Sequence, residues 1–309
     1  MLSVRNLSVT FTLYDVGLVQ KQLTPIIDLD LDVAAGELVA VVGSSGSGKS
    51  LLAHAILGIL PNNAVVGGEM IFKGEPLTAR RQATLRGREI ALIPQAVSFL
   101  DPLQRVGPQV KRAAELSGLS AREAARAQAR AFQRYGLAEE TAHLFPFQIS
   151  GGMARRVLLA TATVGNADLI IADEPTPGLH PEAVRETLAH LRELADEGKA
   201  VALITHDIEA ALGAADKIAV FYAGTALEVA HVDDFRNGGQ ALRHPYTRAL
   251  WRALPQNDFE PVPGAQPPPD ALPQGCLYVE RCPMAIPTCR EYRPSSREVG
   301  GGRVRCFRV

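Results

Sequence analysis

A glycine-rich loop at residues 43–50 ends in a lysine and a serine, a pattern suited to phosphate chemistry. The glycines let the backbone curl so that successive N–H groups point at phosphate oxygens. Lys49 can reach the β- and γ-phosphates of a nucleotide, and the Ser50 hydroxyl group can ligate Mg²⁺. A Gly/Ser-rich turn with an unrelated lysine is the alternative. The apolar run 37–42 before the loop indicates a buried strand, and residues 51–57 indicate a helix whose N-terminus attracts anions, so we expect a nucleoside triphosphate here. The residues predicted to bind it are Gly43, Ser44, Ser45, Gly46, Ser47, Gly48, Lys49, Ser50 and Leu51.

Two carboxylates, Asp173 and Glu174, follow a second apolar run at residues 169–172. Ligands of open α/β sheets bind at the carboxyl ends of the strands. Asp173 is therefore placed to hold Mg²⁺ through water, and Glu174 is placed to polarise the attacking water. An acidic strand end without function is common, but the phosphate loop upstream favours the catalytic interpretation.

A third element, Ser150-Gly151-Gly152, precedes a run with helical character at residues 154–160. A serine-glycine turn at a helix N-terminus can bind an anion. On chemistry alone, an ordinary helix cap is the better interpretation of this turn. The order and spacing of the three motifs along the chain favour an anion-binding role instead.

The elements that position these motifs alternate between strands and helices. Residues 107–136 and 182–195 have helical spacing, and residues 218–222 and 226–229 predict a hairpin. This alternation implies a largely parallel sheet covered on both faces. The strand at 27–33 alternates apolar and acidic residues, as an added antiparallel strand with one water-facing side would.

Composition agrees with a folded globular protein and points to no particular partner. The 309 residues carry a net charge of -1, and 47% are hydrophobic. We find no uninterrupted apolar run of membrane-spanning length and no signal-peptide pattern, so we expect a cytosolic chain whose membrane role comes through partners.

The composition changes near residue 255. Six prolines between 261 and 273 predict an extended, weakly structured linker that separates the body from the tail, so we expect a domain at 1–255 and an extension at 256–309. The tail holds all the cysteines: Cys276, Cys282, Cys289 and Cys306. Four thiolates suit an iron–sulfur cluster or Zn²⁺, with free thiols or disulfides as the remaining alternative. The tail lacks the paired CxxC of a zinc ribbon and has no histidine. We rank the cluster ahead of zinc, mainly on compartment and ligand type.

The ordered motifs resemble those of the ATPase subunits of ATP-binding-cassette (ABC) transporters over about residues 1–255. Residues 43–50 match the Walker A loop, 149–153 the signature motif, and 169–174 Walker B. Gln95 matches the Q-loop and His206 the switch histidine. The resemblance implies a P-loop NTPase fold of the ABC ATPase type, with a mixed sheet core, an antiparallel β subdomain and an α-helical subdomain at about 96–165.

The resemblance also implies ATP and Mg²⁺ as ligands and a head-to-tail dimer. Ser150, Gly151 and Gly152 would then serve the partner's nucleotide, and Phe11 would stack on adenine, with Tyr14 as a substitute. Lys49, Gln95, Glu174 and His206 would be catalytic, and Ser50, Gln95 and Asp173 would bind Mg²⁺. His180 stands where the family usually has an interface aspartate, which suggests a weakened site and a second, non-identical ATPase partner. A tolerated loop variant is the alternative.

Residues 244–250, His-Pro-Tyr-Thr-Arg-Ala-Leu, resemble the tail of oligopeptide, dipeptide and nickel importers, some of which bind a [4Fe–4S] cluster. The expected function is an ATP-hydrolysing subunit at the cytoplasmic face of the inner membrane. It would act with two permeases and, indirectly, an extracytoplasmic binding protein, to import peptides, nickel or other metal complexes. The alternative is a soluble ABC ATPase in a metal-related or regulatory assembly. Nothing in the sequence points to nucleic acid.

Overall fold

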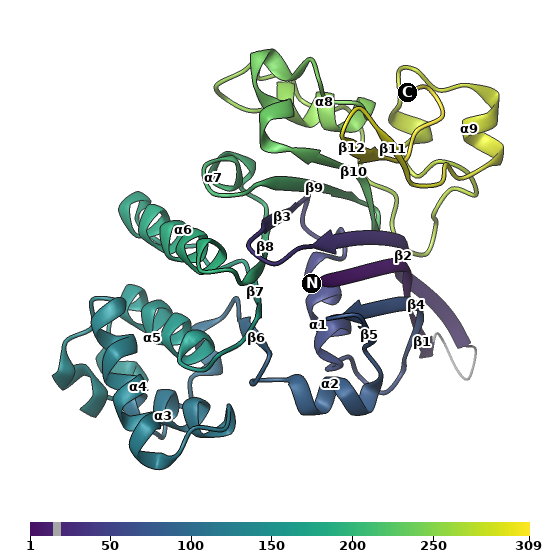
Figure 1. The fold of residues 1–309 in the computed structure, drawn as a ribbon. Helices are drawn as coiled ribbons and strands as arrows, with labels where there is room; N and C mark the ends of the chain where they lie inside the picture. Colours follow the sequence, from purple (N-terminus) through teal and green to yellow (C-terminus); the bar gives the residue numbers. More distant parts are fainter. Residues whose placement is uncertain (15–19) are drawn as a thin grey trace. The chain divides into compact units, whose positions relative to one another are not determined.

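The computed structural model describes residues 1–14 and 20–309, which divide into two compact units (Figure 1). Unit 1 contains Met1 and the residue ranges 33–38 and 78–205. Unit 2 contains the described residues of 2–32, together with 39–77 and 206–309. The residues predicted to bind nucleotide are divided between the two units.

Unit 1 contains three parallel strands with β7 in the middle: β6 (Ile90–Ile93), β7 (Leu169–Asp173) and β8 (Ala200–Thr205). Every residue of β7 and β8 is buried, as expected for parallel strands covered on both faces. The helices of unit 1 are α2 (Ala79–Leu85), α3 (Val106–Leu116), α4 (Ala121–Arg134), α5 (Gly151–Thr163) and α6 (Pro181–Asp196). Its 3₁₀ turns are η1 (Val97–Phe99), η2 (Glu139–His143) and η3 (Pro146–Gln148).

Helices α3, α4 and α5 pack against one another and form the helical part of unit 1 (Figure 1, teal). The helical stretch predicted at 107–136 is confirmed as two helices. Gly118 separates them with a left-handed φ of 107°, and Ser120 starts α4 with a capping box that includes Glu123.

Unit 2 contains a four-stranded sheet in the order β2 (Gln20–Val33), β1 (Leu2–Tyr14), β4 (Ala64–Phe72) and β5 (Glu75–Pro76). A second set of strands runs in the order β11 (Arg297–Val299), β12 (Gly302–Val304), β10 (Thr225–His231), β9 (Lys217–Tyr222) and β3 (Leu38–Val42). Strand β3 is parallel to β9, and the other neighbours in this set are antiparallel. The mixed sheet core, antiparallel subdomain and helical subdomain predicted from the sequence are therefore confirmed.

The helices of unit 2 are α1 (Lys49–Leu57), α7 (Ile208–Leu212), α8 (Pro245–Arg252) and α9 (Pro287–Glu291), with 3₁₀ turns η4 (Val232–Phe235), η5 (Asn237–Gly239) and η6 (Val279–Arg281). The predicted β9–β10 hairpin is confirmed. Its turn residues Ala223 and Gly224 both have positive φ, as a tight two-residue hairpin turn requires. No described helix is both long enough and apolar enough to span a membrane.

The C-terminal tail is joined to unit 2 more closely than the sequence suggested. Residues 253–278 form turns and extended chain without helix or strand, as the prolines predicted. Beyond them, β12 pairs with β10, so the tail extends a sheet of unit 2. The linker therefore leads to a tail that packs on unit 2. The domain boundary predicted at residue 255 stays a prediction.

The acidic face of β2 was predicted to be exposed to water, but in the structure arginines of the tail lie against it. Asp28 pairs with Arg293 at 3.1 Å, and Asp30 pairs with Arg305 at 2.5 Å. Asp32 pairs with Arg303 at 2.9 Å and also with Arg5 of β1. The alternation of apolar and acidic residues along a strand shows that its two faces differ. It does not show whether water or another part of the chain covers the acidic face.

Candidate nucleotide-binding site

The backbone of the phosphate loop requires glycine at two positions that the motif specifies. A Cβ atom on Gly43 would lie 2.6 Å from the Phe221 carbonyl oxygen, and one on Gly48 would lie 2.8 Å from the Pro25 carbonyl oxygen. Gly48 also has a φ of 98° at the start of α1, a conformation that L side chains rarely adopt. The loop is therefore packed tightly against its own unit and curls as a phosphate-binding loop must.

Lys49 is buried within this loop. Its Nζ donates to the carbonyl oxygens of Gly43 at 2.8 Å and Ser44 at 3.0 Å, so the ammonium group is held against the loop's own backbone. The Ser47 Oγ atom is buried and has no hydrogen-bond partner among the residues that the structure describes. A buried polar atom without a partner is costly, and a ligand in the loop can satisfy it. The residues present therefore fit a bound nucleotide phosphate.

Unit 1 holds the acidic pair at the carboxyl end of its central strand. Asp173 ends β7 and is 6% exposed, whereas Glu174 follows with a φ of 48°. The Glu174 backbone N–H donates to the Ile204 carbonyl oxygen at 2.9 Å. A left-handed conformation at a non-glycine residue is unfavourable, and such strain concentrates at functional sites. The backbone hydrogen bond to β8 fixes this turn.

Gln95 lies at the same sheet edge as Glu174. It follows β6 by two residues, and the parallel register pairs Ile93 with Ala172. The Gln95 side chain is exposed, and Arg155 of α5 donates to the neighbouring Pro94 carbonyl oxygen at 3.3 Å. Burial lowers the pKa of Arg155. This contact could not be predicted from the sequence, because a basic residue in a helix does not reveal which carbonyl oxygen it meets.

Ser150 caps helix α5. Its Oγ accepts from the Met153 backbone N–H at 3.2 Å, so the ordinary capping interpretation of this serine is correct as far as the single chain goes. Gly151 and Gly152 have open space where a Cβ would lie. Packing within the chain therefore does not explain these two glycines.

The remaining predicted residues lie at element ends or half-buried positions. His206 is exposed and follows the last residue of β8, and the next residue, Asp207, caps α7 by accepting from Ala210 N at 2.9 Å. Phe11 is half-buried in β1 opposite Ala64, and Tyr14 is 68% exposed at the end of that strand. His180 occupies the N-cap of α6.

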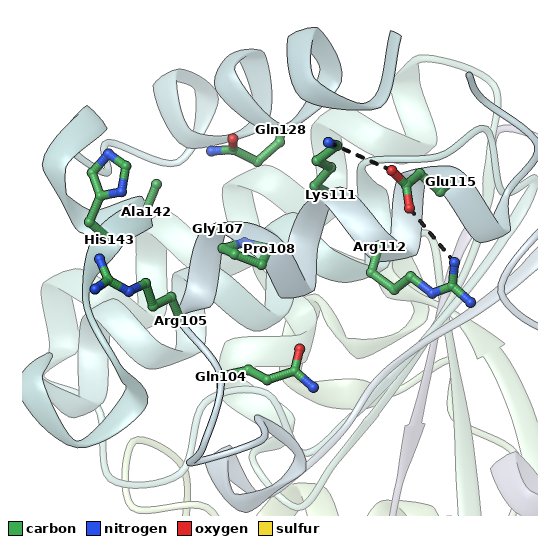
Figure 2. Close-up of a pocket in the computed structure, with 10 residues that line it drawn as sticks. All are labelled: Gln104, Arg105, Gly107, Pro108, Lys111, Arg112, Glu115, Gln128, Ala142 and His143. Carbon is green, nitrogen blue, oxygen red and sulfur yellow. Dashed lines mark ion pairs between the residues drawn. The ribbon is translucent and has the colours of Figure 1, made fainter. Parts of the chain in front are cut away.

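The helical part of unit 1 contains a cavity of about 580 Å³, shown in Figure 2. Its lining comes from residues 104 and 105, helix α3, helix α4 and the turn η2. Lys111 and Arg112 both pair with Glu115, at 3.8 and 3.7 Å, and Arg105 and His143 lie at the other side of the view (Figure 2). Basic residues outnumber acidic ones in the lining, because Glu115 is its one acidic residue.

The four cysteines are free thiols, three of them buried and Cys282 half-buried. Burial raises the pKa of Cys276 to about 11, and Cys289, Cys282 and Cys306 add to the increase. The thiols thus lie close enough to influence one another. Within the described ranges, however, no three His, Cys, Asp or Glu side chains are grouped closely enough to hold one metal ion. The predicted metal site is not assembled in this arrangement of the tail.

Comparison with known proteins places this geometry in a family. Residues 26–177 match the ABC transporter family model, and residues 227–289 match the model for the oligopeptide/dipeptide transporter C-terminal region. The chain is 35% identical to the oligopeptide transport ATP-binding protein OppD of Salmonella typhimurium, covering 100% of this chain and 93% of the relative. It is 36% identical to the probable peptide ABC transporter ATP-binding protein y4tR of Sinorhizobium fredii, covering 91% and 88%.

The fold is also similar to a solved dimeric ATP-binding cassette, MJ0796, in a post-hydrolysis state bound to ADP and Pi. The TM-score is 0.65 at 26% identity, over 75% of this chain and 99% of that chain. A phosphate loop that fits a nucleotide, an acidic strand end and full-length similarity to transporter ATPases agree with one another. The chain therefore belongs to the ATP-binding subunits of oligopeptide/dipeptide ABC transporters and is an ABC-type ATPase.

Proposed function

We propose that this chain hydrolyses MgATP to drive peptide import, as a peripheral subunit on the cytoplasmic face of the inner membrane. One observation carries the proposal: a phosphate loop with an inward-held lysine occurs in the same chain as a tail of the oligopeptide/dipeptide type. The named Salmonella and Sinorhizobium relatives are peptide-transport ATP-binding proteins and support the choice of cargo.

Nucleotide binding is assigned to unit 2. The backbone N–H groups of residues 43–50 would surround the phosphates, and the N-terminus of α1 would add its partial positive charge. Lys49 would exchange its two backbone carbonyl partners for phosphate oxygens, and Ser50 would ligate Mg²⁺. Phe11 would stack on adenine, with Tyr14 as the exposed alternative at the end of β1.

Hydrolysis is assigned chiefly to unit 1. Asp173 would hold Mg²⁺ through water, and Glu174, fixed by its backbone bond to Ile204, would polarise the attacking water. Gln95 at the neighbouring strand end would sense Mg²⁺ and nucleotide, and His206 would contact the γ-phosphate. The chemistry is mainly positioning and charge neutralisation.

The chain would work with a second ATPase subunit in a head-to-tail pair. Ser150, Gly151 and Gly152 would bind the partner's nucleotide, which explains why Gly151 and Gly152 leave open space in the single chain. His180 cannot supply the negative charge of the aspartate that the family usually has there. We therefore propose a non-identical partner, so that only one of the two sites carries this change.

The permease contact is assigned to the surface beside the Figure 2 cavity. Phe99 in η1 is 65% exposed and Leu103 is 86% exposed, and both follow Gln95 closely in the chain. Leu103 directly precedes Gln104, which lines this cavity. Exposed apolar side chains together with basic lining residues suit an amphipathic helix with acidic residues. A cytoplasmic helix of the permease is the proposed occupant.

Co-purification with the permease tests this assignment. Leu103→Asp in unit 1 should reduce the amount of permease that co-purifies. Val65→Asp, at an exposed apolar position in unit 2, should leave that amount unchanged.

The four cysteines are proposed to bind a metal cofactor, an iron–sulfur cluster ahead of zinc. The support is the donor set: four thiols without disulfide partners, which gather in the tail. Binding would require the thiols to come closer together than they lie in this structure. A brown protein after anaerobic purification supports the cluster, colourless protein with stoichiometric zinc supports zinc, and metal-free protein with four alkylated cysteines rejects both.

Transport itself is tested by reconstitution. The chain is co-expressed with two candidate permeases and the second ATPase, purified as a complex, and placed in vesicles with the binding protein. ATP-dependent uptake of a labelled peptide is the expected result, and Lys49→Ala should assemble but not transport. Uptake of nickel ions in place of peptide would change the cargo, and failure to co-purify with any permease would reject the importer.

A further inference from the structure

The proline-rich linker is attached to unit 2 at its start by Arg281. The guanidinium Nε donates to the Pro263 carbonyl oxygen at 2.7 Å, and Nη2 donates to the Val262 carbonyl oxygen at 3.1 Å. Nη1 donates to the Tyr222 hydroxyl group at 3.2 Å. One arginine thus holds two linker carbonyls and the last residue of β9.

Tyr222 also leads directly into the turn that supports the phosphate loop. The Gly224 backbone N–H donates to the Ser47 carbonyl oxygen at 3.1 Å. A Cβ on Gly224 would lie 2.5 Å from the Pro25 carbonyl oxygen, so this turn is packed closely against β2. The start of the linker and the phosphate loop are therefore fixed to the same hairpin.

Further along, the linker reaches the phosphate loop itself. The Ser44 Oγ donates to Gln266 Oε1 at 3.1 Å, across 222 positions of the sequence. Four residues later, Asp270 forms an ion pair with Lys21 of β2 at 2.7 Å. Residues 262–270, here called the strap, are thus attached at both ends and contact the loop in between.

We propose that the strap is part of the nucleotide site and that Gln266 is a positioning residue for the phosphate loop. The inference rests on the proposed nucleotide role of residues 43–50. Ser44 is bonded to Gln266 through its side chain, and its carbonyl oxygen accepts from Lys49 Nζ at 3.0 Å and from Ser47 N at 3.3 Å. Holding the Ser44 side chain restricts the residue whose carbonyl orients the lysine.

The consequence is that the tail contributes to nucleotide affinity. The hydrogen bond joins two side chains that solvent can reach, so its effect is modest, at the lower end of the range for protein hydrogen bonds. Because the bond orders the loop before nucleotide binds, its loss should raise the Kd for ATP and leave turnover of the bound nucleotide unchanged.

The test is a double-mutant cycle on the full chain with a fluorescent ATP analogue. Gln266→Met keeps the side-chain volume but removes the acceptor, and should raise the Kd about threefold. In a Ser44→Ala background the same change should have no further effect, whereas Ser44→Thr, which keeps the hydroxyl group, should preserve the dependence on Gln266. Gln256→Ala, at an exposed position before the strap, is the matched control. An unchanged Kd, or an equal increase in both backgrounds, overturns the inference.

A second pair of variants tests the attachment. Arg281→Lys keeps the charge but cannot make the same three hydrogen bonds, so it should raise the Kd as Gln266→Met does. Arg290→Lys alters an exposed tail pair with Glu280 and should leave the Kd unchanged. Lys49→Ala distinguishes failure of the proposed nucleotide role from failure of the strap inference. If Lys49→Ala fails to weaken ATP binding, the proposed nucleotide role of residues 43–50 fails. If it weakens binding and neither Gln266→Met nor Arg281→Lys does, the strap inference alone fails.

Discussion

Asp30 on β2 and Arg305 near the C-terminus form a 2.5 Å ion pair, with side chains 12% and 6% exposed. They are 275 positions apart in the sequence. The same guanidinium group also donates to the Asp28 carbonyl oxygen. The tail is thus fastened to the antiparallel sheet by a largely buried charge pair, with Arg293 and Arg303 on either side of it.

Arg305→Met should destabilise unit 2, because it leaves the Asp30 carboxylate buried without its cation. Breaking such a pair costs about 3 kcal/mol in the free energy of unfolding. The single tryptophan, Trp251, lies in α8 of the same unit and reports unfolding by fluorescence in urea. Arg290→Met, which removes an exposed pair, should change stability by less than about 0.5 kcal/mol. Equal effects of the two substitutions would contradict the role given to the Asp30–Arg305 pair.

His244 should make the fold sensitive to acid. Burial lowers its pKa from 6.5 to about 3, while its Nδ1 accepts from the Tyr246 N–H and its ring lies beside Tyr278. Glu228 accepts from the His244 backbone N–H. Below pH 6.5 the unfolded chain binds a proton that the folded chain does not. The free energy of unfolding should therefore fall as pH drops, by up to about 1.4 kcal/mol per pH unit.

Urea titrations of the variants between pH 7 and pH 4.5 check this slope. His244→Asn keeps a capping acceptor and removes the titrating ring, so it should flatten the pH dependence even if it lowers stability overall. His231→Asn, at an exposed position, should keep the wild-type slope. The same slope in both variants would show that other groups control the acid response.

His180→Asp should raise the ATPase activity of the assembled complex, on the order of threefold. The aspartate restores an anion at the proposed interface. It also supplies an N-cap for α6, since the His180 side chain makes no capping bond within the described structure, and this adds about 1 kcal/mol of stability. His180→Asn supplies the cap without the charge. Steady-state phosphate release should increase only with aspartate, and an equal increase with asparagine would assign the effect to the cap.

Local chemistry made the phosphate loop and the acidic strand end predictable. The glycines and Lys49 are read directly from the sequence, and an apolar strand before Asp173 places the carboxylates at a sheet edge. The role of Ser150 as a helix cap was also weighed from sequence, and the structure shows that cap.

Contacts made by the tail were not predictable. The alternation along β2 gave no sign that Arg293, Arg303 and Arg305 would cover its acids, because those residues lie more than 260 positions later. Proline-rich sequence indicates an extended chain but not where that chain lies, so the Gln266–Ser44 contact has no local signature. The cysteine spacing predicted a metal site that this arrangement does not assemble.

The most direct test of the central claim is steady-state ATP hydrolysis by the assembled transporter with Glu174→Gln. The substitution keeps the shape of the residue that follows β7 and removes the charge that would polarise water. Hydrolysis should fall by about 10²- to 10⁴-fold while MgATP binding persists. Near-normal turnover by the Glu174→Gln complex would contradict the catalytic assignment on which the account depends.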